Sequence, residues 1–166
     1  MNLTFDLSAI IAVVATVMML TRASAVHALL YLTVSLLAVS LVFFVLGAPF
    51  AAALEVIIYA GAIMVLFVFV IMMLNIGEAA AAQERIWLQP STWIGPSTLA
   101  LLLAIELGAV AVNGGIARPA GVVVSARQVG LGLVGPYMLA VEIASFLLLA
   151  GLVASFHLGR SIMRAE

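Results

Sequence analysis

Five stretches of this chain are apolar over about the length that crosses a lipid bilayer, and they limit the fold more than any other feature. They cover residues 3–20, 25–46, 52–74, 93–112 and 134–157. A helix needs about 20 apolar residues to cross the hydrocarbon, whereas a membrane β-strand needs only about 10 residues of alternating polarity. The runs are continuous and far longer than such strands. We therefore expect an all-α integral membrane protein with five transmembrane helices.

The composition agrees with this fold class and excludes others. Of the 166 residues, 67% are hydrophobic and 8% are charged, against about 25% charged in soluble domains. The net charge of -1 argues against a nucleic-acid partner, which would need a basic face. Without cysteine, the chain lacks thiolates for a metal site or an iron–sulfur cluster. We expect residues 1–166 to form a single membrane domain in the lipid bilayer.

The placement of arginine predicts the orientation of the five spans. The first and third connections and the C-terminus share one side of the membrane, and that side holds most of the arginines. Cytoplasmic segments are enriched in arginine, so we expect the N-terminus outside, in the periplasm, and the C-terminus in the cytoplasm. The cytoplasmic set is Arg22, Arg85, Arg160 and Arg164, and the outer set is Arg118 and Arg127.

Three carboxylates, Glu55, Glu106 and Glu142, lie within or at the edge of apolar runs. A charged side chain in hydrocarbon costs several kcal/mol unless a partner or water receives it. At about 1.5 Å per residue, the expected orientation places all three in the outer half of the membrane. Glu106 has only apolar neighbours in the sequence, and two interpretations of it remain open: it is protonated by desolvation, or it meets polar lipid. No functional role follows for it.

The third run combines polar groups with a weak point in the helix. Glu55 and Tyr59 are four residues apart and so share one helix face. The small residues around Gly61 allow close helix contact and loosen the helical ladder, which favours a π-bulge. Two interpretations remain open. Glu55 and Tyr59 form a proton relay that faces a partner or water, or they lie in the headgroup region. Glu142 is likewise a relay group or a structural acid paired with another subunit.

Several segments resemble a known family. They are 26–32 (VHALLYL), 53–70 (ALEVIIYAGAIMVLFVFV), 93–96 (WIGP) and 135–145 (GPYMLAVEIAS). These segments are similar to the J subunit of bacterial NADH–quinone oxidoreductase, the subunit 6 family of respiratory complex I. The match covers most of the chain, and the segment 53–70 is its most specific part.

The resemblance implies a function in coupling quinone reduction to proton translocation. The family's third helix carries a π-bulge that can relax to α-helix, which maps here onto Tyr59 to Val65. Rotation of this segment would move Met64, Leu66 or Phe67 into or out of a water path and so gate proton movement. The expected residues of the proton path or gate are Glu55, Tyr59, Gly61, Met64, Val65, Phe67 and Glu142.

The resemblance also implies partners and cofactors. The expected neighbours are the A, H, K and N types of membrane subunit in the bacterial inner (plasma) membrane, rather than further copies of this chain. FMN, the iron–sulfur clusters, NADH and quinone are expected on other subunits, so this would be a non-catalytic subunit with no redox chemistry of its own. Residues 130–135 spell G-x-G-x-x-G, but a membrane run follows, and Glu142 comes too soon for a dinucleotide site.

Two alternatives remain beside the coupling subunit. The chain could be a purely structural scaffold of the same kind of complex, with polar residues that serve only packing. It could also be an independent small transporter, although five spans do not divide into the equal inverted halves common among transporters.

Overall fold

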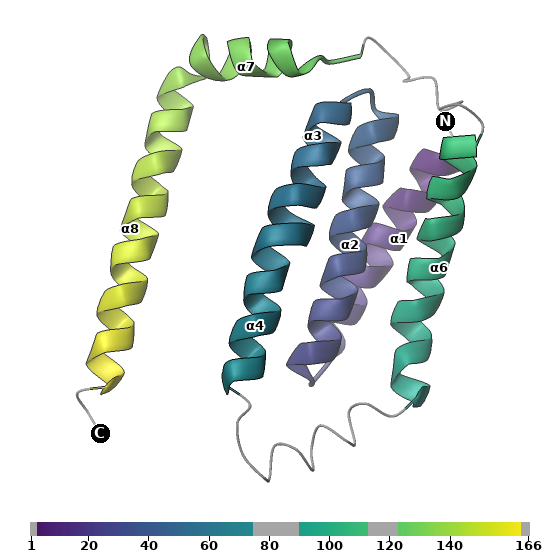
Figure 1. Ribbon diagram of the computed structural model, residues 1–166, viewed down its shortest axis with the longest axis horizontal. Coiled ribbons are helices and arrows are strands. Elements are labelled where there is room, and N and C mark those ends of the chain that lie inside the picture. Colours follow the sequence, from purple (N-terminus) through teal and green to yellow (C-terminus); the bar gives the residue numbers. More distant parts are fainter. Residues whose placement is uncertain (1–2, 75–89, 113–122, 164–166) are drawn as a thin grey trace. The chain divides into compact units, whose positions relative to one another are not determined.

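The computed structural model describes residues 3–74, 90–112 and 123–163. The helices are α1 (Leu3–Thr21), α2 (Ala25–Val45), α3 (Pro49–Leu54), η1 (Glu55–Ile63), α4 (Met64–Leu74), α6 (Pro90–Val112), α7 (Ala126–Val134) and α8 (Met138–Met163) (Figure 1). No strand occurs in these ranges, and five helices there are long and apolar enough to cross a membrane. The predicted all-α membrane fold class is therefore confirmed.

The chain forms two compact units, Met1–Val124 and Ser125–Glu166. In the first unit, α2 is the central helix, because it packs against α1, against α6 and against the continuous third helix made of α3, η1 and α4 (Figure 1). Its buried core comes from three helices and consists of Ile11, Ala12, Ala15, Val34, Ala38, Leu41 and Leu103. The prediction of a single domain over 1–166 stays a prediction.

Small and hydroxylated side chains bring α1 and α2 together. Ala15 and Ala38 are fully buried, and such small residues let helix backbones approach closely in a membrane. Beside them, Thr16 Oγ1 and Ser35 Oγ lie 2.8 Å apart, and they lie 2.8 and 3.1 Å from the carbonyl oxygen of Ala12. With one proton each, the two hydroxyls can form two of these three hydrogen bonds at a time. The polar groups of this contact are thus satisfied without water.

The turn from α2 to α3 depends on Gly47. This residue has a φ of 87°, a left-handed conformation that glycine adopts without the steric cost of a Cβ atom. Its carbonyl oxygen accepts a 2.8 Å hydrogen bond from the Val124 amide. The turn lets the third helix begin at Pro49, earlier than the predicted residue 52.

The second unit contains a short helix that we did not expect. We predicted a connection up to about residue 133, but α7 occupies Ala126–Val134. Ser125 and Gln128 form a capping box, with Gln128 N donating to Ser125 Oγ at 3.3 Å and Ser125 N donating to Gln128 Oε1 at 2.8 Å. Such a box satisfies amides at a helix start, so a short helix forms although its sequence contains two glycines.

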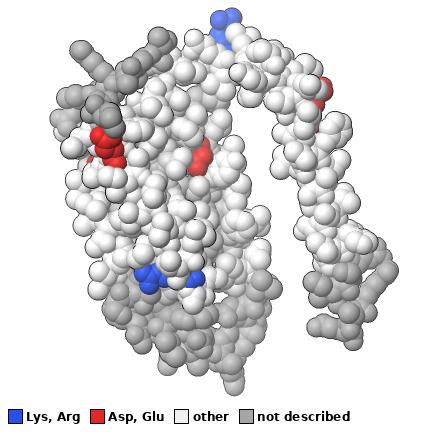
Figure 2. Space-filling model, turned by 180° about the vertical axis from the view of Figure 1, so that it is seen from behind, with Lys and Arg blue, Asp and Glu red and all other residues white. Residues whose placement is uncertain are grey.

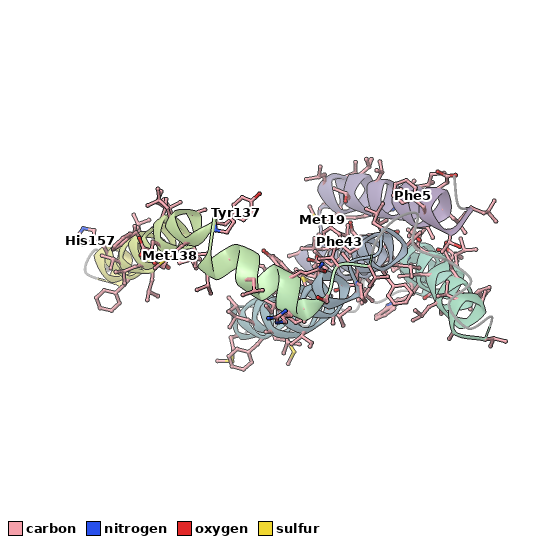
Figure 3. All side chains as sticks on the ribbon, turned by 90° about the horizontal axis from the view of Figure 1, so that it is seen from above. Phe5, Met19, Phe43, Tyr137, Met138 and His157 are labelled. Atoms are coloured by element: carbon pink, nitrogen blue, oxygen red, sulfur yellow. The ribbon has the colours of Figure 1, made fainter. Side chains whose placement is uncertain are left out.

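The last membrane helix begins later than predicted, at Met138 rather than at residue 134, because Gly135 ends α7 and a turn precedes α8. Side chains project on all sides of α8, which Tyr137 precedes and which carries Met138 and His157 (Figure 3). Its membrane-length part has 0% of its residues buried within this chain. In α6, Pro96 lies inside the helix rather than at its start, a break in hydrogen bonding that membrane helices tolerate.

Candidate functional site

The most unusual backbone in the described chain is η1, a π-helix of nine residues, Glu55–Ile63, within the third membrane helix. At its end the amide of Met64 donates to the carbonyl of Tyr59, five residues earlier, and to that of Gly61. A π-helix is wound by i→i+5 bonds and occurs mostly as single turns, often at functional sites. The predicted π-bulge at Tyr59 to Val65 is confirmed in kind, and it begins and ends earlier than predicted.

Gly61 fits the wide turn because it lacks a side chain. A Cβ atom at this position would lie 3.1 Å from the carbonyl oxygen of Val56, closer than ordinary van der Waals contact. Any larger residue would therefore press on the carbonyl group one wide turn earlier. The glycine that the sequence marked as a weak point lies where the π-helix needs a small residue.

Glu55 and Tyr59 both lie in η1. The wider turn changes their expected alignment, because i→i+4 residues stack on one face only when the helix is α-helical. Tyr59 is 49% exposed, and Glu55 is partly exposed. No hydrogen bond or ion pair joins their side chains in the described part of the chain, so within the first unit both remain open to lipid, water or another subunit.

The three predicted gate residues after η1 lie in α4 and face different ways. Met64 is 3% exposed, whereas Val65 and Phe67 are 66% and 47% exposed. Because α4 packs against α2, Met64 is the side chain that this part of the helix buries in the bundle. Val65 and Phe67 lie on its open surface.

Glu142 lies in α8, in the second unit, and its side chain is exposed there. Ser145, which the sequence places one turn later, does not bond the carboxylate. Its hydroxyl donates instead to the backbone carbonyl of Glu142 at 2.7 Å. A partner for the Glu142 carboxylate would therefore have to come from outside α8.

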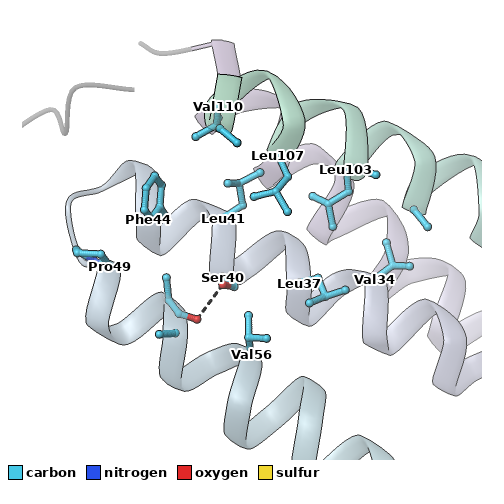
Figure 4. Close-up of a pocket in the computed structure, with 15 residues that line it drawn as sticks. Val34, Leu37, Ser40, Leu41, Phe44, Pro49, Val56, Leu103, Leu107 and Val110 are labelled. Carbon is cyan, nitrogen blue, oxygen red and sulfur yellow. Dashed lines mark hydrogen bonds between the residues drawn. The ribbon is translucent and has the colours of Figure 1, made fainter. Parts of the chain in front are cut away.

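An apolar pocket of about 630 Å³ borders the start of η1. It lies among α2, α6 and the third helix, and Val56 of η1 lines it together with Leu37, Leu41, Leu103 and Leu107 (Figure 4). On its wall, the buried hydroxyl of Ser40 donates to the carbonyl of Ala52 at 2.9 Å. This bond ties α2 to the last α-helical turn before the π-helix, while the pocket leaves space beside it.

The variant Ser40→Ala should destabilise the bundle by about 1 kcal/mol, the net value of one buried hydrogen bond. The expected result is a lower midpoint of thermal unfolding in detergent. Thr33→Ala is a matched control, because the Thr33 hydroxyl bonds only the Leu29 carbonyl of its own helix, at 2.9 Å. Equal midpoints for the two variants would contradict a role of Ser40 in holding α3.

The sequence marked Glu106 as an acid within an apolar run, but it did not reveal which polar groups away from the third helix are buried. Glu106 is 7% exposed and His27 is 3% exposed. Tyr31 is also buried; it packs under the guanidinium of Arg22, whose Cζ lies 5.3 Å from the ring centroid, and its hydroxyl lies against Gly95. The spacing of residues along one helix does not reveal which neighbouring helix covers them, so these contacts had no signal in the sequence.

In the first unit, the acidic and basic side chains lie toward opposite ends of the helices. Its acidic side chains lie toward one end of the bundle and its basic side chain lies toward the other (Figure 2). The described acids are Asp6, Glu55 and Glu106, and the described base is Arg22. No cluster of His, Cys, Asp or Glu that could hold a metal ion occurs among the described residues. The arginines that we used for orientation at positions 85, 118 and 164 lie outside those residues.

Comparison with known proteins agrees with the resemblance. Residues 15–158 match the family described as NADH-ubiquinone/plastoquinone oxidoreductase chain 6. NADH-quinone oxidoreductase subunit J of Pseudomonas aeruginosa is 57% identical in an alignment of 166 positions that covers 96% of this chain and 97% of the relative. The subunit J proteins of Escherichia coli K12 and of Buchnera aphidicola from Schizaphis graminum are 56% and 46% identical, over 100% and 96% of this chain and 90% and 98% of the relatives.

The matched region includes all of the π-helix and reaches from α1 into α8. The family match covers far more than half of the chain, and the three relatives match almost its full length. The chain therefore belongs to the NADH-ubiquinone/plastoquinone oxidoreductase chain 6 family, which includes subunit J of bacterial NADH-quinone oxidoreductase.

Proposed function

We propose that this chain is a membrane-arm subunit of a proton-pumping NADH:quinone oxidoreductase, and that it couples quinone reduction to proton translocation through a change in the winding of η1. The names of its relatives support the first part. The nine-residue π-helix inside a membrane helix is the observation that carries the second part. A passive membrane span has no need of such a segment.

A change in winding would exchange the side chain that faces α2. A π-helical turn holds an extra residue compared with an α-helical turn. Loss of one extra residue would rotate the following helix by about 100°, which is the angle between successive residues of an α-helix. Buried Met64 would then give way to a neighbour such as Val65, which is now 66% exposed. Such a rotation changes which side chains fill the space beside α2.

The apolar pocket makes this movement sterically feasible. A packed protein interior resists the insertion of extra volume, but η1 borders an open space of about 630 Å³ through Val56. Side chains at the start of η1 can therefore reorient toward that space. A dry apolar contact at Met64 would block protons, and a hydrated gap in its place would conduct them.

Glu55, Tyr59 and Glu142 are the groups proposed to pass the proton or to anchor its water path. An acid within membrane spans is costly unless a partner or water receives it. Since the described part of this chain provides neither carboxylate with a side-chain partner, we assign that role to other subunits and to water between them. Their expected types are A, H, K and N.

We also propose a location and an orientation for the chain. It lies in a bacterial inner (plasma) membrane, with the N-terminus in the periplasm and the C-terminus in the cytoplasm. NADH, FMN, iron–sulfur clusters and quinone would bind to other subunits, so the chain would contribute no redox group itself. A purely structural scaffold is the competing function, and it would use the same acids only for packing.

The variants Glu55→Gln and Glu142→Gln separate the relay from the scaffold. A positioned proton-transfer group contributes roughly 10²–10⁴-fold to its step, so we expect proton pumping to fall below about a tenth if either acid is a relay. Assembly and NADH oxidation with an artificial electron acceptor should persist. Pumping would be measured as acidification of inverted membrane vesicles.

Asp6→Asn is a suitable control for these variants, because Asp6 lies in the first turn of α1 and not in η1 or α8. A scaffold predicts a different pattern. The glutamine variants would then either fail to assemble or pump as well as the parent complex, and both results would count against the relay.

A further inference from the structure

Glu106 is an acid that the proposed gate does not use. It lies in α6, one turn after the buried core residue Leu103, and only 7% of its surface is exposed. Within the described residues, neither of its carboxyl oxygens, Oε1 and Oε2, makes a hydrogen bond. An ionised carboxylate left unpaired in an apolar interior is far more costly than a neutral carboxylic acid. The carboxyl group must therefore either stay protonated or pair with a cation.

Ser8 of α1 is a polar side chain beside the Glu106 carboxyl group, although the two groups do not meet hydrogen-bond geometry in the structure. Ser8 is fully buried. The Ser8 hydroxyl donates its only proton to the carbonyl oxygen of Thr4 at 2.7 Å, which leaves Ser8 Oγ free to accept but not to donate. A carboxylate can only accept, whereas a protonated carboxyl group can also donate. The local hydrogen bonding thus suits the acid form and not the ion.

No described cation lies beside Glu106 to pair with it as an ion. The main helix contacts of α6 are with α1 and α2. Their described titratable side chains are Asp6, another acid, on α1, and His27 and Tyr31 on α2. The third helix, which shares the apolar pocket with α6, contributes Glu55, again an acid. Tyr31 contacts α6 at Gly95, which is about 16 Å from position 106 at 1.5 Å per residue. The described part of α6 contributes no other titratable group.

We propose that Glu106 is a proton-binding site of the α1–α6 contact, which holds its proton at neutral pH and donates it in a hydrogen bond to Ser8 Oγ. The site is separate from η1, since it lies on a different helix and faces α1. Because the chain itself already covers 93% of the residue (7% exposed), a cation or a basic side chain of another subunit has little room to reach it. The failure of this proposal would leave the proposed gate untouched.

Infrared spectroscopy of the purified complex tests this assignment. The carbonyl stretching band of a protonated carboxylic acid is distinct from the bands of a carboxylate. We expect the spectrum of Glu106→Gln, subtracted from that of the parent complex, to show the loss of one acid band. We expect Ser8→Ala to keep that band but shift it to higher frequency, because the acceptor of its hydrogen bond is gone. Asp6→Asn should leave it in place.

Thermal unfolding provides a second readout. A group that binds a proton in the folded state but not in the unfolded state makes stability fall as the pH rises. The parent complex should therefore lose stability relative to Glu106→Gln as the pH rises above about 4.3, the ordinary pKa of a glutamate in an unfolded chain, by up to tenfold in the unfolding equilibrium per pH unit.

Loss of a carboxylate band in place of an acid band would overturn the proposal and indicate an ion paired with a cation. A stability difference that does not change with pH would overturn it as well. If Glu106→Gln does not assemble, the Ser8→Ala spectrum decides, because an unshifted acid region in that variant contradicts a hydrogen bond from Glu106 to Ser8.

Discussion

Gly61→Leu is expected to abolish most of the proton pumping of the assembled complex and to lower the number of protons moved per NADH oxidised. Two effects of this substitution favour an α-helical winding over the π-helix. A Cβ atom at position 61 crowds the carbonyl oxygen of Val56 at 3.1 Å, and leucine is a better α-helix former than glycine by up to about 1 kcal/mol. The third helix would then be held in one of its two proposed states.

The size of the effect follows from the population of the two windings. Overpacking costs about 1–3 kcal/mol, and a bias of that size shifts a two-state equilibrium by about 5–150-fold. The measurement is the ratio of proton uptake to NADH oxidation in vesicles that contain the purified complex. Val65→Gly, which loosens the helix just after η1, should also change this ratio.

Gly108→Leu is the matched control for Gly61→Leu. Gly108 is also a glycine inside a membrane helix, but no described atom outside its own helix backbone and chain neighbours lies within 4 Å of a Cβ atom built on it. The Gly108→Leu complex should therefore pump like the parent complex. If Gly61→Leu also keeps the parent ratio of protons to NADH, the winding of η1 does not control translocation, and the gate proposal fails.

Gly95→Ala is expected to reduce the amount of assembled complex and its thermal stability. Position 95 in α6 faces Tyr31 of α2, which is 2% exposed. A Cβ atom there would collide with the Tyr31 hydroxyl and lie 3.2 Å from Cζ of its ring. Either α6 moves away from α2 or the buried ring shifts, and such overpacking costs about 1–3 kcal/mol.

A double variant tests whether Tyr31 is the cause. Tyr31→Phe removes the colliding hydroxyl, so Gly95→Ala should be milder in the Tyr31→Phe background. The interaction between the two substitutions is read from the unfolding midpoints of the single and double variants, as in a double-mutant cycle. Strict additivity would contradict a direct collision. Gly108→Ala, on the open face of the same helix, should leave the midpoint nearly unchanged.

The five spans were predictable because the length and polarity of a run decide whether lipid can solvate a helix. The π-helix was predictable in kind, since the small residues around Gly61 weaken the α-helical ladder, but not in its bounds. It starts at Glu55, shortly after the turn at Gly47 and the residue that the Ser40 hydroxyl bonds, Ala52. The bond from Ser40 joins two helices, and the sequence of the third run alone does not reveal it.

The misses have the same physical origin. The segment that contains α7 looked like a connection because it includes Arg127, Gln128 and two glycines, but a capping box at Ser125 is enough to start a helix. The sequence marked Glu106 as an acid in a membrane run, but it did not reveal the surroundings of Glu106 and Gly95, because Ser8 and Tyr31 are far away in the sequence. Which side of a membrane helix meets which neighbour is decided by tertiary packing, and one sequence does not encode it in a local pattern.

The close contact between α1 and α2 has a consequence for biosynthesis. Only residues 22–24 separate the two helices, so their alanine contact and the Thr16–Ser35 bridge need no later part of the chain. Ribosomes add about 5–20 residues per second, and N-terminal parts generally fold first. The hairpin therefore has several seconds in the bilayer before the last helix is made. The third and fourth spans can then pack against an α1–α2 surface that has already formed.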